Sequence, residues 1–213
     1  EGDGSMNVIS RILDEPSVSR GDYVFDSDHM FFSDYSNRLA DTLDEVNWTS
    51  VLRLSKELLA TKICGSRVFL CGNGGSAANA NHIANDLVYA VTECTGSGFD
   101  AVSLTANSAV LTCLANDVGY ENIFSEQLAV SGQENDLLLV LSGSGSSENI
   151  LNALVMAKKL RMRTAAILGF DGGNCKKITD FPVHVAVNDM QISEDIQLVI
   201  GHMIMKWLKK ELV

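Results

Sequence analysis

The sequence predicts an α/β domain with a doubly wound, mainly parallel sheet of five strands. From residue 65 onward, short apolar runs alternate with stretches of helical periodicity, as in consecutive β-α-β units. The apolar runs are continuous, which indicates strands covered by helices on both faces. Two of these runs lead directly into glycine- and serine-rich turns, where ligands bind in such folds.

The elements follow in order along the chain. Residues 1–5 before Met6 resemble a tag remnant, and we expect residues 1–34 to be this remnant and a mobile arm. Residues 35–213 are expected to form a single domain. Apolar residues recur at helical spacing from 31 to 63, and Asn47 is a candidate cap where this stretch breaks into two helices. Strands are then expected at 68–71, 101–104, 137–141, 164–168 and 183–187. Helices are expected at 76–91, 108–115, 123–131, 148–160 and 193–212.

Composition excludes several functions. The chain has a formal net charge of -11, so a basic nucleic-acid-binding face is not expected. No apolar stretch is long enough to span a membrane, and no dinucleotide fingerprint or P-loop motif calls for a nucleotide cofactor. Five cysteines without a C-x-x-C motif predict reduced, mostly buried thiols and a cytoplasmic protein.

The two turns predict a site for a phosphorylated small molecule. Residues 72–76 include Asn73, Gly74 and Ser76, and let the backbone approach a ligand closely. Residues 142–147 offer hydroxyls, among them Ser142, Ser144 and Ser147, at the start of a helix. Backbone N–H groups, hydroxyls and the helix dipole together suit a phosphate without a lysine. Tight turns with capping serines are the alternative explanation.

These residues resemble a known family. The serine-rich turn is similar to that of the sugar isomerase (SIS) domain. Residues 72–77 with His82, and residues 104–107 and 115–124, resemble the phosphoheptose isomerase group more narrowly, and the similarity covers about residues 35–212. The resemblance implies a flavodoxin-like fold and a homotetramer with shared active sites, the N-terminal helices packing at its interfaces. It also implies isomerisation of sedoheptulose 7-phosphate to D-glycero-D-manno-heptose 7-phosphate, through an enediol, for lipopolysaccharide or capsule synthesis.

Two helical pairs are the candidate acid and base. His82 and Asp86 are four residues apart and share one helix face. Glu194 and His202 lie about 80° apart around the last helix. The resemblance implies proton transfer by Asp86 and His202. It also implies a divalent metal, zinc first, on these four residues, and sugar contacts from Asn73, Asn107 and Glu194.

Three positions depart from the family pattern. Asp86 stands where the family has Glu, Glu194 where it usually has Gln, and Asn107 where it often has an acid. Two alternatives therefore remain: a non-catalytic regulator that binds a phosphosugar or a replication initiator, and an isomerase for another phosphosugar. The presence of both His82 and His202 favours an enzyme. His29 and His184 are not expected to be catalytic.

Overall fold

The computed structural model describes residues 26–213, so most of the predicted arm lies outside the described residues. The chain divides into two units, residues up to Arg38 and residues from Leu39 onward. Helix α2 (Asp26–Asp44) starts five residues earlier than the periodicity predicted and includes His29. Helix α3 (Trp48–Ile63) follows the predicted break. Asn47 caps it, accepting bonds from the backbone N–H groups of Thr49 and Ser50 at 3.1 and 3.2 Å.

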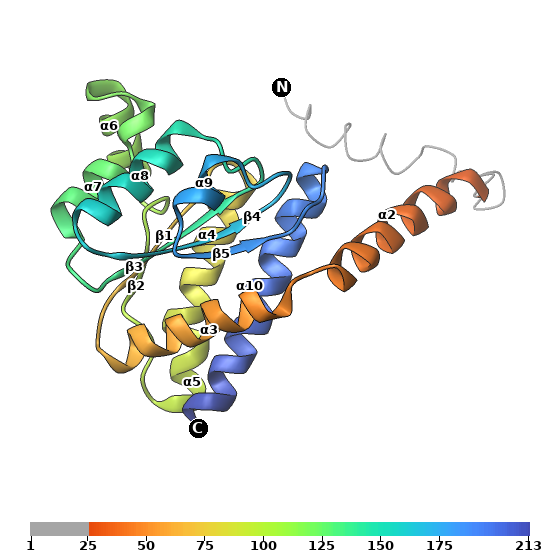
Figure 1. The fold of residues 1–213 in the computed structure, drawn as a ribbon, viewed down its shortest axis with the longest axis horizontal. Helices are drawn as coiled ribbons and strands as arrows, with labels where there is room; N and C mark the ends of the chain where they lie inside the picture. Colours follow the sequence, from red (N-terminus) through yellow and green to blue (C-terminus); the bar gives the residue numbers. More distant parts are fainter. Residues whose placement is uncertain (1–25) are drawn as a thin grey trace, which may run out of the picture. The chain divides into compact units, whose positions relative to one another are not determined.

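The larger unit contains a five-stranded parallel sheet, as predicted, in the order β2-β1-β3-β4-β5 (Figure 1). The strands are β1 (Val68–Cys71), β2 (Ala101–Ser103), β3 (Leu137–Ser142), β4 (Arg163–Leu168) and β5 (Phe181–His184). The last strand starts two residues before the predicted range. It includes Pro182, which an edge strand tolerates because one side of its backbone needs no partner.

Helices cover both faces of the sheet. Helices α3, α4 (Gly75–Asn85) and α10 (Met190–Leu212) lie on one face (Figure 1). Helices α7 (Ser125–Ser131), α8 (Glu148–Lys159) and α9 (Gly173–Ile178) lie on the other. Helix α9, six residues long, was not predicted because it is too short to show a periodic pattern. The predicted helix 76–91 contains a π-helical turn in its second half. The helices of this unit and their short turns are α4 (Gly75–Asn85), η1 (Asp86–Ala90), α5 (Val91–Thr95), α6 (Ser108–Asp117), η2 (Tyr120–Asn122), α7 (Ser125–Ser131), α8 (Glu148–Lys159), α9 (Gly173–Ile178) and α10 (Met190–Leu212).

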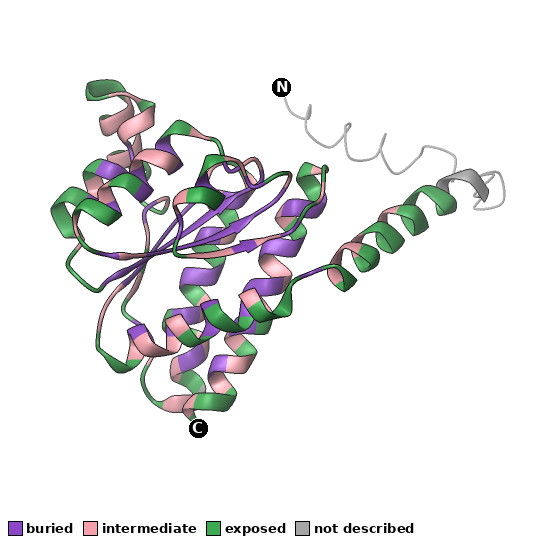
Figure 2. Ribbon diagram, in the orientation of Figure 1, coloured by how far each residue is buried: buried purple, intermediate pink, exposed green. Residues whose placement is uncertain are grey.

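The core lies between the sheet and these helices. All residues of β1 and β3 are buried, as their continuous apolar sequences predicted, and Figure 2 shows the central strands buried. Leu138 and Val140 join a cluster with Leu128 of α7 and Leu154 of α8. No helix within residues 26–213 has both the length and the apolar character that a membrane crossing requires.

The cysteine prediction holds only in part. Cys71 and Cys175 are buried, whereas Cys64 and Cys113 are exposed, so the expectation of mostly buried thiols is wrong for these two. Burial raises the pKa of Cys175 to about 11, which keeps it a thiol near neutral pH.

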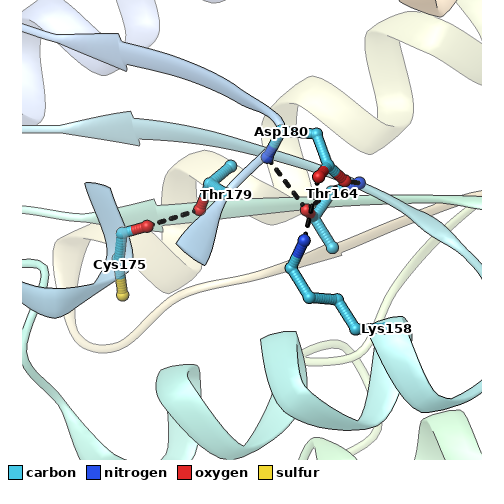
Figure 3. Close-up of polar contacts among 5 residues, drawn as sticks. All are labelled: Lys158, Thr164, Cys175, Thr179 and Asp180. Carbon is cyan, nitrogen blue, oxygen red and sulfur yellow. Dashed lines mark hydrogen bonds and ion pairs between the residues drawn. The ribbon is translucent and has the colours of Figure 1, made fainter. Parts of the chain in front are cut away.

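An aspartate ties the two last strands together (Figure 3). Oδ2 of Asp180 accepts bonds from the backbone N–H and the hydroxyl of Thr164 at 3.0 and 2.6 Å. Its Oδ1 accepts from Nζ of Lys158 on α8 at 2.8 Å. Asp180, the residue before β5, is therefore bonded to the start of β4 and to the covering helix α8.

The strand order determines where a ligand would bind. Strand β1 has β2 on one side and β3 on the other. The chain therefore adds β2 to one side of β1 and the later strands to the other side, which makes the gap between β1 and β3 the point where the strand order reverses. In open parallel sheets, ligands bind beyond the carboxyl ends of the strands at this point. Both predicted turns, residues 72–76 and 142–147, start there.

Candidate active site

The serine-rich turn after β3 is partly held by its own hydroxyls. Oγ of the buried Ser142 accepts the N–H of Gly145 at 3.0 Å, and Oγ of Ser144 accepts the N–H of Ser146 at 3.3 Å. Ser147 is the N-cap residue of α8, but its side chain makes no capping bond. The turn thus places the Ser147 hydroxyl and the positive end of the α8 dipole at the same point.

A small cavity of ≈ 80 Å³ opens between the two turns. Of the eight residues predicted to bind substrate, all but Gly74 and Asn107 line it. Its walls also include residues that the sequence did not single out. The complete lining is Asn73, Ser76, Leu141, Ser142, Gly143, Ser144, Ser147, Met190 and Glu194.

The two exceptions have other local roles. Gly74 is the N-cap of α4 and has a positive φ of 55°, which a side chain rarely tolerates. Asn107 caps α6, where its Oδ1 accepts the N–H groups of Ala109 and Val110 at 3.1 and 3.3 Å. A contact between Asn107 and sugar therefore stays a prediction, and only its amide N–H₂ would be free of the cap.

Asn73 links the two turns directly. Its side-chain amide pairs reciprocally with that of Asn149 on α8, with N···O distances of 2.9 and 2.8 Å. The hydroxyl of Tyr120 also donates to Oδ1 of Asn73 at 3.0 Å. Sequence reasoning missed the role of Asn149, which lies two residues after Ser147 and is buried. This pair holds the first turn against the start of α8.

Glu194 lies against the first turn. A Cβ added to Gly75 would lie 2.2 Å from Oε2 of Glu194, so only glycine leaves room for this carboxylate. Glu194 thus brings a carboxylate to the wall of a cavity whose other polar side chains are the Asn73 amide and four serine hydroxyls. It is not part of the histidine cluster with which the sequence grouped it.

His82, Asp86 and His202 converge at a second point. The Nε2 atoms of the two histidines lie 2.9 Å apart, and Oδ2 of Asp86 lies 3.5 and 3.7 Å from them. The side chain of Asp86 is only 14% exposed, whereas the two imidazoles are nearly half exposed. Asp86 begins the π-helical turn, an irregularity that is frequent at functional sites.

Close packing of α4 and α10 brings the histidines together. A Cβ on Gly201 would lie 2.8 Å from Cδ1 of Ile83, so the two helices approach closely where glycine has no side chain. His82 and His202 are the chain neighbours of these two residues. Asn79 ties the same helices further along, since its Nδ2 donates to the Glu194 carbonyl and to Oε1 of Gln197 at 2.8 and 3.2 Å.

The cluster fits a divalent metal. Its three donor atoms all lie within 4.8 Å of one another. Zinc binds imidazole nitrogen and carboxylate oxygen at about 2.0–2.2 Å, so an ion could contact all three atoms from a shared centre. Three of the four predicted metal ligands, His82, Asp86 and His202, therefore lie in one cluster. Without an ion, the same groups can pass a proton, because an imidazole and a carboxylate can each act as an acid or a base.

Comparisons with known proteins agree on one family. Residues 31–169 match the model of the SIS domain. The phosphoheptose isomerase of Clostridium acetobutylicum is 41% identical over 148 residues, which are 70% of this chain and 75% of that protein. The one from Sulfurimonas denitrificans is 38% identical over 75% of this chain and 81% of its own length. The structure of a phosphoheptose isomerase from Francisella tularensis superposes with a TM-score of 0.80 at 27% identity, covering 88% of this chain and 99% of that one.

Proposed function

Because the chain belongs to the SIS-domain family, within its phosphoheptose isomerase group, we propose that it converts sedoheptulose 7-phosphate to D-glycero-D-manno-heptose 7-phosphate. One observation carries the proposal beyond family membership. The hydroxyl-lined cavity and the His82–Asp86–His202 cluster stand on the same two helices, α4 and α10. One site can hold a phosphate while the other acts on the distant end of the same molecule.

The spacing of the two sites suits a long sugar. Ser76 lines the cavity and His82 belongs to the cluster, and six residues of α4 separate them. At a rise of 1.5 Å per residue this is about 9 Å along the helix axis. That separation is comparable to the distance from the phosphate to the carbonyl end of an extended heptose 7-phosphate. A shorter phosphosugar would reach the cluster less well.

The proposed reaction moves one proton between adjacent carbons. Asp86 takes the proton from C1 of the ketose, and an enediol forms as the C2 carbonyl oxygen gains a proton. His202 supplies that proton and removes the one on the C1 oxygen as the new carbonyl forms. Asp86 then returns its proton to C2. His82 orients His202 through the Nε2–Nε2 contact, and Ser76, Ser142, Ser144 and Ser147 hold the phosphate.

We also propose that His82, Asp86 and His202 hold a divalent ion, with zinc the best match to two imidazoles and a carboxylate. When bound, the ion would polarise the sugar oxygens and stabilise negative charge on the enediol. Asp86 could hold it with one carboxylate oxygen and exchange a proton at the other. His202 would hold the ion through Nε2, which faces the cluster, and would exchange its proton at Nδ1. Glu194, the fourth predicted ligand, lines the cavity, which leaves a coordination position for a sugar oxygen.

The proposal includes a cytoplasmic homotetramer with shared sites. The described cysteines are free thiols, which suits a reducing compartment. In or next to β2, α6 and α7, Val102, Val118 and Val130 are exposed, and no residue of α6 is buried. A second subunit would cover such a surface.

The decisive experiment is incubation with sedoheptulose 7-phosphate, with and without a chelator, followed by NMR of the sugar. We expect the heptose 7-phosphate to appear. Loss of conversion with the chelator, restored by zinc, would assign the metal-assisted route, and unchanged conversion would assign proton transfer without a metal. No conversion in any metal condition would reject the isomerase in favour of another phosphosugar or a binding role.

A further inference from the structure

A second loop forms the outer wall of the serine-rich turn. Residues 169–172 connect β4 to α9 and, with Gly173 at the start of α9, lie in direct backbone contact with residues 142–146. The N–H of Cys175 donates to the carbonyl of Gly145 at 2.9 Å, and the N–H of Gly169 donates to that of Ser142 at 3.3 Å. A Cβ on Gly145 would lie only 2.1 Å from the carbonyl oxygen of Gly172. Movement of this β4–α9 loop would therefore move the turn.

The β4–α9 loop has an unfavourable backbone conformation. Phe170 has a φ of +44°, and Gly172 and Gly173 have φ values of +81° and +51°. A positive φ is routine for glycine but rare for phenylalanine, because its Cβ crowds the backbone. A conformation of this kind persists only where the surroundings hold it. Something must therefore hold the peptide group of Phe170.

His184, at the end of β5, provides part of that hold, beside the carbonyl of Val187, which accepts the N–H of Phe170 at 3.0 Å. Its Nε2 lies 2.9 Å from the carbonyl oxygen of Phe170, and its Nδ1 lies 3.0 Å from Nζ of Lys176 on α9. A carbonyl only accepts and a lysine ammonium only donates, so His184 must be neutral, with its proton on Nε2. The imidazole thus joins β5, the β4–α9 loop and α9 at one point.

We propose that His184 is a positioning residue for phosphate binding. It acts at a distance, since it does not line the cavity, and it fixes the β4–α9 loop that supports Gly145 and Ser146 of the serine-rich turn. The inference rests on the proposed function for its ligand, a phosphate monoester in that turn. It concerns affinity for the phosphate and leaves the chemistry at Asp86 and His202 untouched.

Two variants of the full chain test this role. His184→Phe keeps an aromatic ring but removes both bonds. His184→Gln restores them, because its amide N–H can donate to Phe170 and its oxygen can accept from Lys176. We expect His184→Phe to raise KM for sedoheptulose 7-phosphate, and the dissociation constant of inorganic phosphate measured by calorimetry, by the same factor of about 5–20. We expect kcat within twofold of wild type, and recovery of both constants to within threefold in His184→Gln.

The result that would overturn the proposal is equally specific. Wild-type phosphate affinity in a folded His184→Phe protein would overturn it, as would a loss of kcat at constant KM. If His184→Phe fails to fold, Lys176→Met removes only the anchor of Nδ1, and we expect a twofold to fivefold weaker phosphate affinity. Wild-type phosphate affinity in Lys176→Met would also overturn the proposal. The calorimetry needs no turnover, so failure of the isomerase reaction and failure of this inference are distinguishable.

Discussion

Nε2 of His82 and Nε2 of His202 lie 2.9 Å apart although 120 residues separate them in the chain. Two nitrogens at this distance cannot both carry a proton, so one donates and the other accepts. Oδ2 of Asp86 lies 3.5 and 3.7 Å from the two nitrogens. The two imidazoles and the carboxylate therefore act as one unit.

His202→Ala should abolish most turnover without unfolding the protein. Removing a positioned acid or base costs about 10²–10⁴-fold in rate. We expect kcat for sedoheptulose 7-phosphate to fall by that range, with an unchanged circular dichroism spectrum. Met203→Ala, at a half-exposed neighbour on α10, serves as the control and should retain activity. Full activity of His202→Ala would remove His202 from the mechanism.

Gly201→Ala should separate the histidines. Alanine favours a helix over glycine by up to about 1 kcal/mol, but its Cβ would meet the side chain of Ile83. We therefore expect stability to change little while kcat falls about tenfold. Ile83→Ala removes both colliding atoms, Cδ1 and Cγ1, so the double variant should recover part of the activity. Additive losses in this cycle would contradict a contact between the two positions.

Zinc should bind with one ion per chain. Elemental analysis after dialysis should find equimolar zinc in the wild type and little in a His82→Ala, His202→Ala double variant, because two of three ligands are gone. Glu194→Gln provides a comparison, since Glu194 lies outside the cluster and zinc content should be retained. Equal zinc in the double variant would place the ion elsewhere.

Glu194→Gln should strengthen phosphate binding. Glu194 lines the cavity, and two like charges about 4 Å apart repel by about 1 kcal/mol even in water. We expect the dissociation constant of inorganic phosphate to fall about threefold to tenfold in calorimetry. Asp195→Asn removes the same charge from an exposed position next to it and should change affinity less. Weaker binding by Glu194→Gln would show that the carboxylate assists the ligand.

Asp180 should make stability depend on pH. Burial raises the pKa of Asp180, but the bonds from Lys158 and Thr164 outweigh it and hold the pKa below its usual range. A lowered folded-state pKa stabilises the protein above the unfolded value, near 3.9, and the effect is lost as pH falls through the folded value.

We therefore expect Asp180→Asn to lower the free energy of unfolding at pH 7 by about 1 kcal/mol, a modest value because the side chain is 43% exposed. The difference from wild type should shrink as pH falls below about 4. Urea unfolding across this range measures it. Asp100→Asn, in the more exposed pair with Arg67, should cost less. An equal difference at pH 3 and pH 7 would contradict the assignment.

Local patterns in the sequence determined the strands, most helices and both turns. Continuous apolar runs predict buried parallel strands because both faces are covered, and glycine and serine mark turns through backbone freedom and capping. The family resemblance added the candidate roles of His82, Asp86 and His202, which stay predictions. The short α9, the π-helical turn at Asp86 and the start of β5 were missed, since none has a long periodic signal.

Only the tertiary structure decided which of the candidate groups meet. The sequence placed Glu194 with the histidines, but packing of α10 sets its carboxylate against Gly75 in the cavity wall. The contact between His82 and His202 depends on the close approach of α4 and α10 at Gly201. The contact between His184 and Phe170, which are 14 residues apart, also depends on the tertiary structure. Periodicity describes what each segment buries, whereas long-range contacts depend on how the buried faces fit together.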